Sequence, residues 1–282
     1  MHWCTQQKHH ITTMLDCYII NLDRAQDRWK TNSEKFRPLG LNVIRMPAIE
    51  GKDLTFPRPD FAPWRFFFYY GRKMVPNKVA CFLTHIKILK TFLTTDKEHV
   101  MICEDDVYPL PELVDVLKDA MRYSKSWDFL RLNGIKPTKG IDVAVLPHGF
   151  HLRCDVKTAS GTGAYVVNRY AAETIIRKCL PVRLPTDLTY FRDWPIGIRE
   201  MTIHPFPIPL NETASNDSTI GKEYRYPIVH PASLRHIISL PYRICSRSTR
   251  RFTRICWAMQ NYILPPQPYS VKTNTNVEVT QH

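Results

Sequence analysis

The chain has 282 residues, of which 44% are hydrophobic, so it is long enough to bury one large core or two modest ones. Aromatic residues at 11% and charged residues at 23% exclude a largely disordered protein. The net charge of +13 is concentrated near the C-terminus, because residues 224–282 contain eight basic residues and one acidic residue.

Two further features narrow the class of protein. No apolar run approaches the ~18 residues of a membrane-spanning helix, and the first ten residues lack the apolar core of a signal peptide. The eight cysteines form no C-x-x-C pair, which favours reduced thiols in a cytosolic protein. Met14 directly precedes the first apolar run, so we expect residues 1–13 to be a leader of little structural meaning.

The first predicted elements form a βαβ unit. C-Y-I-I-N-L at 17–22 is a short apolar run, typical of a strand covered on both faces. A helix is predicted next, because one helical face carries Ala25, Trp29, Ser33 and Phe36. Pro38 and Gly40 are expected to end it. L-N-V-I-R-M at 41–46 predicts a second strand.

The next segment interrupts this pattern. Four prolines within residues 53–76 predict an ordered loop, and its aromatic run at 64–70 either packs as a lid, which we favour, or stacks on a sugar. Apolar residues at helical spacing predict a helix over 78–94, and H-V-M-I-C at 99–103 predicts the next strand.

The remaining elements continue the alternation. We expect a helix from Pro111, strands near 127–134 and 164–167, and a helix over 169–180. The sequence therefore predicts a single α/β domain over 14–230, with a mainly parallel central sheet flanked by helices. Residues 231–282 are predicted to be a basic C-terminal extension.

Glu104, Asp105 and Asp106 stand side by side where the predicted strand 99–103 ends. Adjacent like charges resist burial, so they require a cation or a solvated turn. Carboxylates at the carboxyl end of a strand suit Mg²⁺ or Mn²⁺ with a substrate diphosphate. In the alternative interpretation the acids cap the helix that begins near Pro111.

Six motifs in order resemble glycosyltransferase family 25. They are Y-I-I-N-L-D-R-A-Q-D-R-W (18–29), P-A-I-E-G-K-D-L (47–54), V-A-C-F-L-T-H-I (79–86), M-I-C-E-D-D-V (101–107), S-G-T-G-A-Y-V-V (160–167) and L-P-T-D (184–187). The resemblance implies a GT-A type nucleotide-sugar fold, a UDP-sugar donor and a metal-dependent transfer. Lys78 and Ala80 depart from the family pattern, where an acid and a glycine are typical.

The resemblance also implies roles for individual residues. Glu104 and Asp106 would hold Mn²⁺ or Mg²⁺, with Asp105 between them. The other residues that the resemblance assigns to the donor are Asn21, Asp23, Arg24, Arg28, Glu50, Gly51, Thr84, His85, Gly163 and Tyr165. Two alternatives stay open: Arg24 and Arg28 are also spaced like solvated helix residues, and His85 suits a half-buried structural histidine.

An inverting transfer needs a carboxylate that accepts the proton of the acceptor hydroxyl. We expect Asp187 to be this base, with Asp193 in reserve, although Asp187 would also suit the N-cap of a short helix. His204 is a further candidate metal ligand, or simply part of a strand-end turn.

The basic extension suits an anionic membrane surface, with a merely solvated segment as the alternative. No nucleic-acid partner is expected, because no recognised nucleic-acid module accompanies the arginines. The predicted function is an inverting transfer of a hexose, galactose from UDP-galactose, to a glycan or glycolipid such as the lipopolysaccharide core, on the cytoplasmic face of the inner membrane. The alternatives are another UDP-sugar transferase, such as a glucosyltransferase, or a non-catalytic basic protein that binds membrane or nucleic acid.

Overall fold

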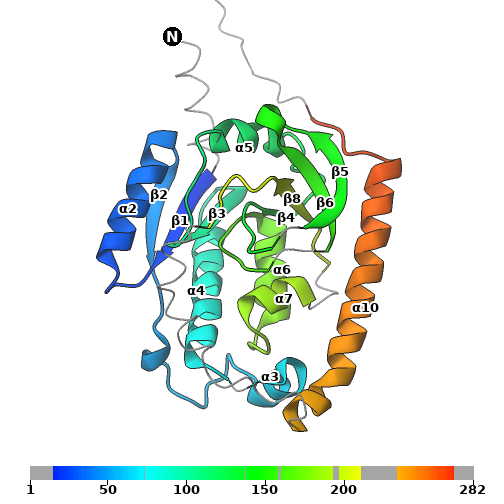
Figure 1. The fold of residues 1–282 in the computed structure, drawn as a ribbon. Coiled ribbons are helices and arrows are strands. Elements are labelled where there is room, and N and C mark those ends of the chain that lie inside the picture. The colour runs from blue at the N-terminus through cyan, green and yellow to red at the C-terminus, as the bar shows by residue number, and fades with distance from the viewer. Residues whose placement is uncertain are drawn as a thin grey trace, which may run out of the picture.

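The structure is a computed structural model that describes residues 15–72, 74–136, 138–157, 160–192, 197–210 and 234–269. The expected leader lies outside these residues. An eight-stranded sheet runs through the centre, with helices against both of its faces (Figure 1). The strands in sheet order are β2 (Asn42–Pro47), β1 (Leu15–Asn21), β3 (His99–Glu104), β7 (Ala164–Asn168), β4 (Phe129–Arg131), β8 (Glu200–His204), β6 (His151–Lys157) and β5 (Lys139–Val145).

The predicted βαβ unit at the start of the chain is confirmed. β1 pairs in parallel with β2, and α2 (Gln26–Phe36) connects them with Ser33 and Phe36 buried. A short 3₁₀ helix, η1 (Arg37–Leu39), follows α2, and Gly40 ends it at a φ of 75°, which glycine adopts without strain. The α/β class and the flanking helices are likewise as predicted.

The sheet is mixed, so the prediction of a mainly parallel sheet is wrong. Only the pairs β1–β2, β1–β3 and β4–β8 are parallel, whereas β7 runs antiparallel to both β3 and β4. The hairpin of β5 and β6 was not predicted, and it adds two more antiparallel pairs, β5–β6 and β6–β8. Chain order indicates that strands and helices alternate, but strand direction depends on crossovers that periodicity does not reveal.

The segment 53–76, predicted to be an ordered loop, includes a helix. It follows a short 3₁₀ helix, η2 (Gly51–Asp53), and contains the helix α3 (Pro63–Tyr70). Pro63 occupies the first turn of α3, where its missing N–H costs nothing, so this proline starts a helix rather than preventing one. Phe66 and Tyr70 lie four residues apart and are both buried, which agrees with the packing interpretation of the aromatic run.

Alternation along the strands creates two cores. In β3, Met101 and Cys103 face the core that α2 and α5 (Leu113–Met121) cover. Val100 and Ile102 face the opposite core, which contains α3, α4 (Pro76–Leu93) and α6 (Arg169–Cys179). Packing in the two cores positions the carboxyl edge of the sheet. It also determines which side of α4 faces that edge.

The last described helix, α10 (Leu234–Ile263), packs against β5, β6 and α3 and also contacts α7 (Thr186–Arg192) (Figure 1). The rings of Tyr69 and Tyr242 stack between α3 and α10 at a centroid distance of 4.1 Å. In the middle of α10, the buried Arg254 forms an ion pair with Glu200 of β8. None of the helices in the described ranges is long and apolar enough to cross a membrane.

Candidate functional site

The acid triplet lies at the edge of the sheet where the parallel strands end. β3 ends at Glu104, and Asp105 and Asp106 occupy the turn that follows. Because β1 and β2 run parallel to β3, the segments that follow them reach the same edge. Ligands of open α/β sheets bind at this edge, so the position favours a binding site.

Two side chains approach the Glu104 carboxylate. The Thr162 hydroxyl donates to Glu104 Oε1 over 3.1 Å, and Nε2 of His85 lies 3.8 Å from the same oxygen. Burial alone would raise the pKa of Glu104, but the His85 imidazole and the Thr162 hydroxyl outweigh burial and lower it. Glu104 is therefore a charged carboxylate at neutral pH.

His85 is a fully buried residue of α4 and is positioned by Tyr165 of β7. Its Nδ1 lies 2.8 Å from the Tyr165 hydroxyl oxygen, and the two rings stack at a centroid distance of 5.7 Å. Its Nε2 has no hydrogen-bond partner in the described part of the chain. Tyr165 therefore supports the site from behind rather than lining it.

Asp105 is the member of the triplet that is engaged from the side of β1 and α2. Asn21 Nδ2 donates to Asp105 Oδ2 over 2.7 Å, and Arg28 Nη1 lies 3.2 Å from Oδ1. Burial raises the pKa of Asp105, although Arg28 and Asn21 oppose this effect. Asp105 thus joins the start of α2 to the triplet and leaves the outer two acids available.

Asp106 has the properties of a cation ligand. Its Oδ1 is buried and has no hydrogen-bond partner among the described residues. Burial and the negative charges of Glu104 and Asp105 raise the pKa of Asp106 to about 7. A divalent cation would relieve both conditions, and carboxylate oxygens are the ligands that Mg²⁺ and Mn²⁺ prefer. The alternative that the acids cap α5 is not supported, because Glu112 occupies that N-cap and no side chain caps it.

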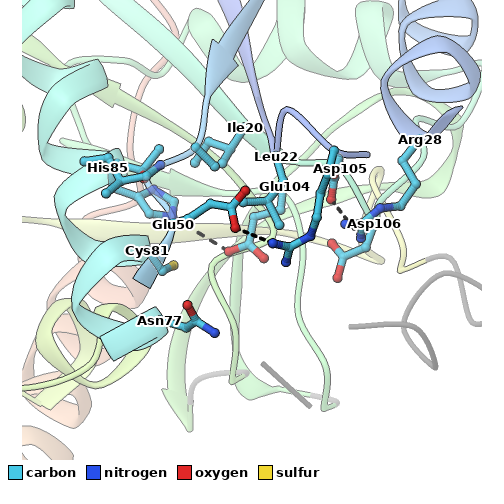
Figure 2. A pocket seen from close by; sticks show the side chains of 14 residues that line it. Ile20, Leu22, Arg28, Glu50, Asn77, Cys81, His85, Glu104, Asp105 and Asp106 are labelled. Atoms are coloured by element: carbon cyan, nitrogen blue, oxygen red, sulfur yellow. Dashed lines mark hydrogen bonds and ion pairs between the residues drawn. The ribbon is translucent and has the colours of Figure 1, made fainter. Parts of the chain in front are cut away.

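A first pocket of about 730 Å³ opens beside the triplet (Figure 2). Figure 2 shows Cys81 and Asn77 on the α4 side of this pocket and Arg28 reaching Asp105 from the opposite side. The lining residues are Ile20, Leu22, Arg24, Arg28, Ala48, Ile49, Glu50, Asn77, Cys81, Thr84, His85, Glu104, Asp105 and Asp106.

Glu50 forms ion pairs with two basic side chains at the rim of the first pocket. Arg24 forms an ion pair with Glu50, and Lys52 Nζ lies 3.3 Å from the same carboxylate oxygen. Arg24 and Lys52 are well exposed, so these pairs contribute little to stability. The rim of the first pocket therefore presents exposed basic groups that an anionic ligand could reach.

The segment 48–51 is tied to α4 by two hydrogen bonds. The Thr84 hydroxyl oxygen accepts from the Ile49 N–H over 3.0 Å, and Asn77 Oδ1 accepts from the Gly51 N–H over 2.9 Å. A Cβ on Gly51 would come within 2.1 Å of Asn77 Oδ1, so only glycine fits there. Gly51 consequently shapes the wall of the pocket without lining it.

A second pocket of about 700 Å³ shares Cys81, Glu104 and Asp106 with the first. Asp187 lines it as the second residue of α7, inside the helix, so the N-cap interpretation of Asp187 is not supported. Gly163 also lines it, and a Cβ there would come within 2.5 Å of Asn133 Oδ1. The two pockets meet at the acids, which gives room for two ligands on opposite sides.

Several predicted site residues lie outside both pockets. Asp23 is exposed and pairs with Arg45 over 2.7 Å. His204 ends β8, three strands from β3 or about 14 Å at the usual strand spacing, and its charged neighbours are on β5 and β6. The structure therefore does not bring His204 to the acids, and the strand-end interpretation fits its position. Asp193 lies outside the described residues.

Sequence reasoning missed the contribution of Cys81. It expected only a reduced thiol there, but Cys81, His85 and Glu104 each offer a ligand atom within 4.8 Å of the others, as metal ligands do. The signal was present, because Cys81 and His85 are four residues apart in a predicted helix and so share one face. We call these three residues the softer ligand set, because it contains a sulfur atom. It shares Glu104 with the pair of carboxylates formed by Glu104 and Asp106.

Both pockets lie at the carboxyl edge of an α/β sheet, where the ligands of such sheets bind. Sequence comparison identifies the family. The family model described as glycosyltransferase family 25 (LPS biosynthesis protein) matches residues 14–190, which is more than half of the chain. The chain therefore belongs to glycosyltransferase family 25. This membership agrees with the α/β architecture of a GT-A type fold.

Curated relatives share only a part of their length with this chain. A "Glycosyltransferase 25 family member" of Aedes aegypti is 31% identical over 122 residues, which are 40% of this chain and 20% of that protein. A protein of the same name from Anopheles gambiae is 30% identical over 122 residues, with the same two coverages. The chain thus spans about a fifth of the length of these relatives.

Among solved structures, similarity is weaker. A197 from STIV has a TM-score of 0.37 at 12% identity, covering 67% of this chain and 81% of that one. A glycosyltransferase involved in glycosylation of the major capsid of PBCV-1 has a TM-score of 0.37 at 11% identity, covering 67% and 80%. Scores this low carry no argument about the fold or the site.

Proposed function

We propose that the protein is a glycosyltransferase that moves a hexose from a UDP-sugar to a hydroxyl group of a glycan. The observation that carries this proposal is the meeting of two pockets at Glu104 and Asp106. A transferase must hold a donor and an acceptor on opposite sides of the bond that is exchanged, and two adjoining pockets meet this requirement. Family membership supports the same reaction class.

In this proposal the first pocket takes the UDP part of the donor. Arg24 and Arg28 supply guanidinium groups for the diphosphate, and the segment 48–50 forms the wall beside the nucleoside. Glu104 and Asp106 would hold Mn²⁺ or Mg²⁺, which fits the unpartnered Oδ1 of Asp106. When bound, such a cation neutralises the charge that develops on the departing UDP.

The second pocket takes the acceptor. Asp187 is the proposed base: its carboxylate accepts the proton of the acceptor hydroxyl as that oxygen bonds to the anomeric carbon and the bond to UDP breaks. A direct attack of this kind inverts the anomeric configuration. Asp193 remains the reserve for this role.

The finer identity of the substrates comes from the family. The family description refers to LPS biosynthesis, and the resemblance implies galactose from UDP-galactose as the donor sugar. We therefore propose a lipopolysaccharide-type core sugar as the acceptor. A lipid-linked acceptor would also place the enzyme at the cytoplasmic face of a membrane.

The test is donor turnover by the full chain with a panel of radiolabelled UDP-sugars, with and without chelator. Asp106→Asn should lose most Mn²⁺-dependent donor binding, and Asp187→Asn should keep donor binding and lose transfer by about 10²-fold or more. Asp115→Asn, an exposed carboxylate on α5, is the matched control and should behave as the wild type. Wild-type turnover by either site variant would remove that residue from its role. Failure of UDP with Mn²⁺ to raise the melting temperature would overturn the proposal.

A further inference from the structure

The outward face of α10 is apolar. At the 100° rotation of successive helical residues, its exposed apolar side chains fall within an arc of about 140°. Their exposed fractions range from 37% for Ile255 to 70% for Tyr262. They are Ile237, Leu240, Ile244, Phe252, Ile255, Met259, Tyr262 and Ile263, and we call them the α10 apolar stripe. A stripe of this length on the outside of a folded domain indicates a surface that something covers.

A second face of α10 already has its partners. Ser239, Arg254, Ala258 and Asn261 are buried against the domain. Arg254 is anchored by Glu200, and its Nη1 donates to the backbone oxygen of Asp155 over 3.2 Å. These contacts fix the rotation of α10, so its exposed stripe faces away from the body of the protein. Figure 1 shows α10 at the outer edge of the molecule.

Cations without acidic partners lie along the stripe, with Arg251 inside its arc and Arg247 at its edge. Arg247 and Arg251 are exposed, and neither forms an ion pair with a described residue. Arg243 packs near Arg247 and Arg72, and its pKa is lowered by burial and by these two like charges. No Asp or Glu occurs between residues 224 and 277, so nothing on α10 itself neutralises this group. Uncompensated guanidinium groups beside an apolar face complement an anionic surface.

We propose that α10 is a membrane-docking helix whose apolar stripe enters the headgroup boundary of an anionic lipid bilayer while the arginines along it bind lipid phosphates. The arrangement matches an interfacial helix, which lies in the plane of the membrane with its apolar face inward. The helix α3 contacts α10 and adds two exposed aromatic side chains, Trp64 and Phe68, of the kind that favours the interface. The proposal rests on the surface of α10 and on the adjoining α3, and it is independent of catalysis.

The test is co-sedimentation of the full chain with vesicles of phosphatidylcholine alone or of phosphatidylcholine mixed with phosphatidylglycerol. The wild type should bind the mixed vesicles, bind the neutral ones much less, and lose binding as salt rises. The double variant Phe252→Glu/Met259→Glu should lose binding by more than tenfold. Its matched control is Thr249→Glu/Gln260→Glu, which adds the same charge to exposed positions of the same helix outside the stripe and should retain most binding. Arg247→Gln and Arg251→Gln should each weaken binding about fivefold.

Three results would overturn the proposal. One is equal vesicle binding by the two glutamate double variants, which would show that the stripe is not used. Another is absence of wild-type binding to the mixed vesicles. The third is a dimer in light scattering that the stripe variant disperses without any vesicle binding, which would make a second copy of the chain the occupant. Circular dichroism and melting temperature would confirm that each variant is folded.

Discussion

Nδ1 of His85 lies 2.8 Å from the hydroxyl oxygen of Tyr165, and this contact decides which ring nitrogen faces Glu104. Because Nδ1 is occupied by Tyr165, Nε2 is the nitrogen that lies 3.8 Å from the Glu104 carboxylate. Tyr165 is itself fixed by stacking on Phe129 at a centroid distance of 4.6 Å. Tyr165, which lies directly behind a lining residue of the pocket, thus controls the orientation of the imidazole that lowers the pKa of Glu104.

Tyr165→Phe removes the hydroxyl group and keeps the stacked ring. We expect the free energy of unfolding to fall by about 1 kcal/mol, the usual contribution of one hydrogen bond. The stabilisation of the protein by UDP with Mn²⁺ should also fall, because His85 can then rotate away from Glu104. Urea unfolding of Tyr165→Phe, His85→Gln and the double variant would measure the coupling. Strictly additive losses would contradict a functional contact between the two side chains.

The softer ligand set predicts a distinct response to transition metals. Co²⁺ should bind Cys81, His85 and Glu104 and give a sulfur-to-cobalt charge-transfer absorption band, which Zn²⁺ or a chelator should abolish. Cys81→Ser should lose the band and keep stabilisation by Mn²⁺ through Glu104 and Asp106. Cys245→Ser, which removes an exposed free thiol of α10, is the control and should keep the band. A band that survives in Cys81→Ser would place the metal elsewhere.

The elements that sequence periodicity predicted well are those that bury one face. In α4, Val79, Phe82, Ile86 and Leu89 recur at helical spacing, so the core alone determines that segment. The predicted strand 99–103 also appears as β3, because a continuous apolar run suits a strand covered on both faces. The acids after it were found for the same reason: a charged triplet directly after a buried strand must reach an edge.

What the sequence did not predict depends on contacts between distant segments. β5 is only partly buried, so its strand depends on pairing with β6 and on contact with α10. Tyr165 gave no sign of holding His85, which lies 80 residues away. His204 and Glu104 both end strands at the same edge of the sheet. Local periodicity does not predict the strand order, which places them three strands apart.

Arg254 is predicted to be the main electrostatic anchor of α10. It is buried beside Glu200, whose other carboxylate oxygen lies 3.0 Å from Arg131 Nε. Burial would raise the pKa of Glu200, but Arg254 and Arg131 lower it, so a charged carboxylate stays in the interior. Arg254→Met leaves that charge with one cation fewer and should lower the free energy of unfolding by about 3–5 kcal/mol.

The matched control for Arg254→Met is Arg251→Met, since Arg251 is exposed on the same helix. Its change should stay within about 0.5 kcal/mol. Chemical unfolding of both variants would compare them directly. Similar losses in both would mean that the buried ion pair does not anchor α10.

Asp155 next to this ion pair gives the stability of the fold a defined pH dependence. Burial raises the pKa of Asp155 to about 6, and the neighbouring carboxylate of Glu200 adds to the increase, while Thr202, Thr138 and Arg254 oppose it. The unfolded chain releases this proton near pH 3.9, so between about pH 4 and pH 6 the folded state binds more protons than the unfolded state. Stability from this group is therefore complete below about pH 4, falls as pH rises to about 6, and is constant above, with a total loss of about 3 kcal/mol.

Asp155→Asn cannot titrate, so the difference in unfolding free energy between wild type and variant should fall across this window. Urea unfolding at a series of pH values measures that difference, and a flat line would show that Asp155 is ionised in the folded state throughout.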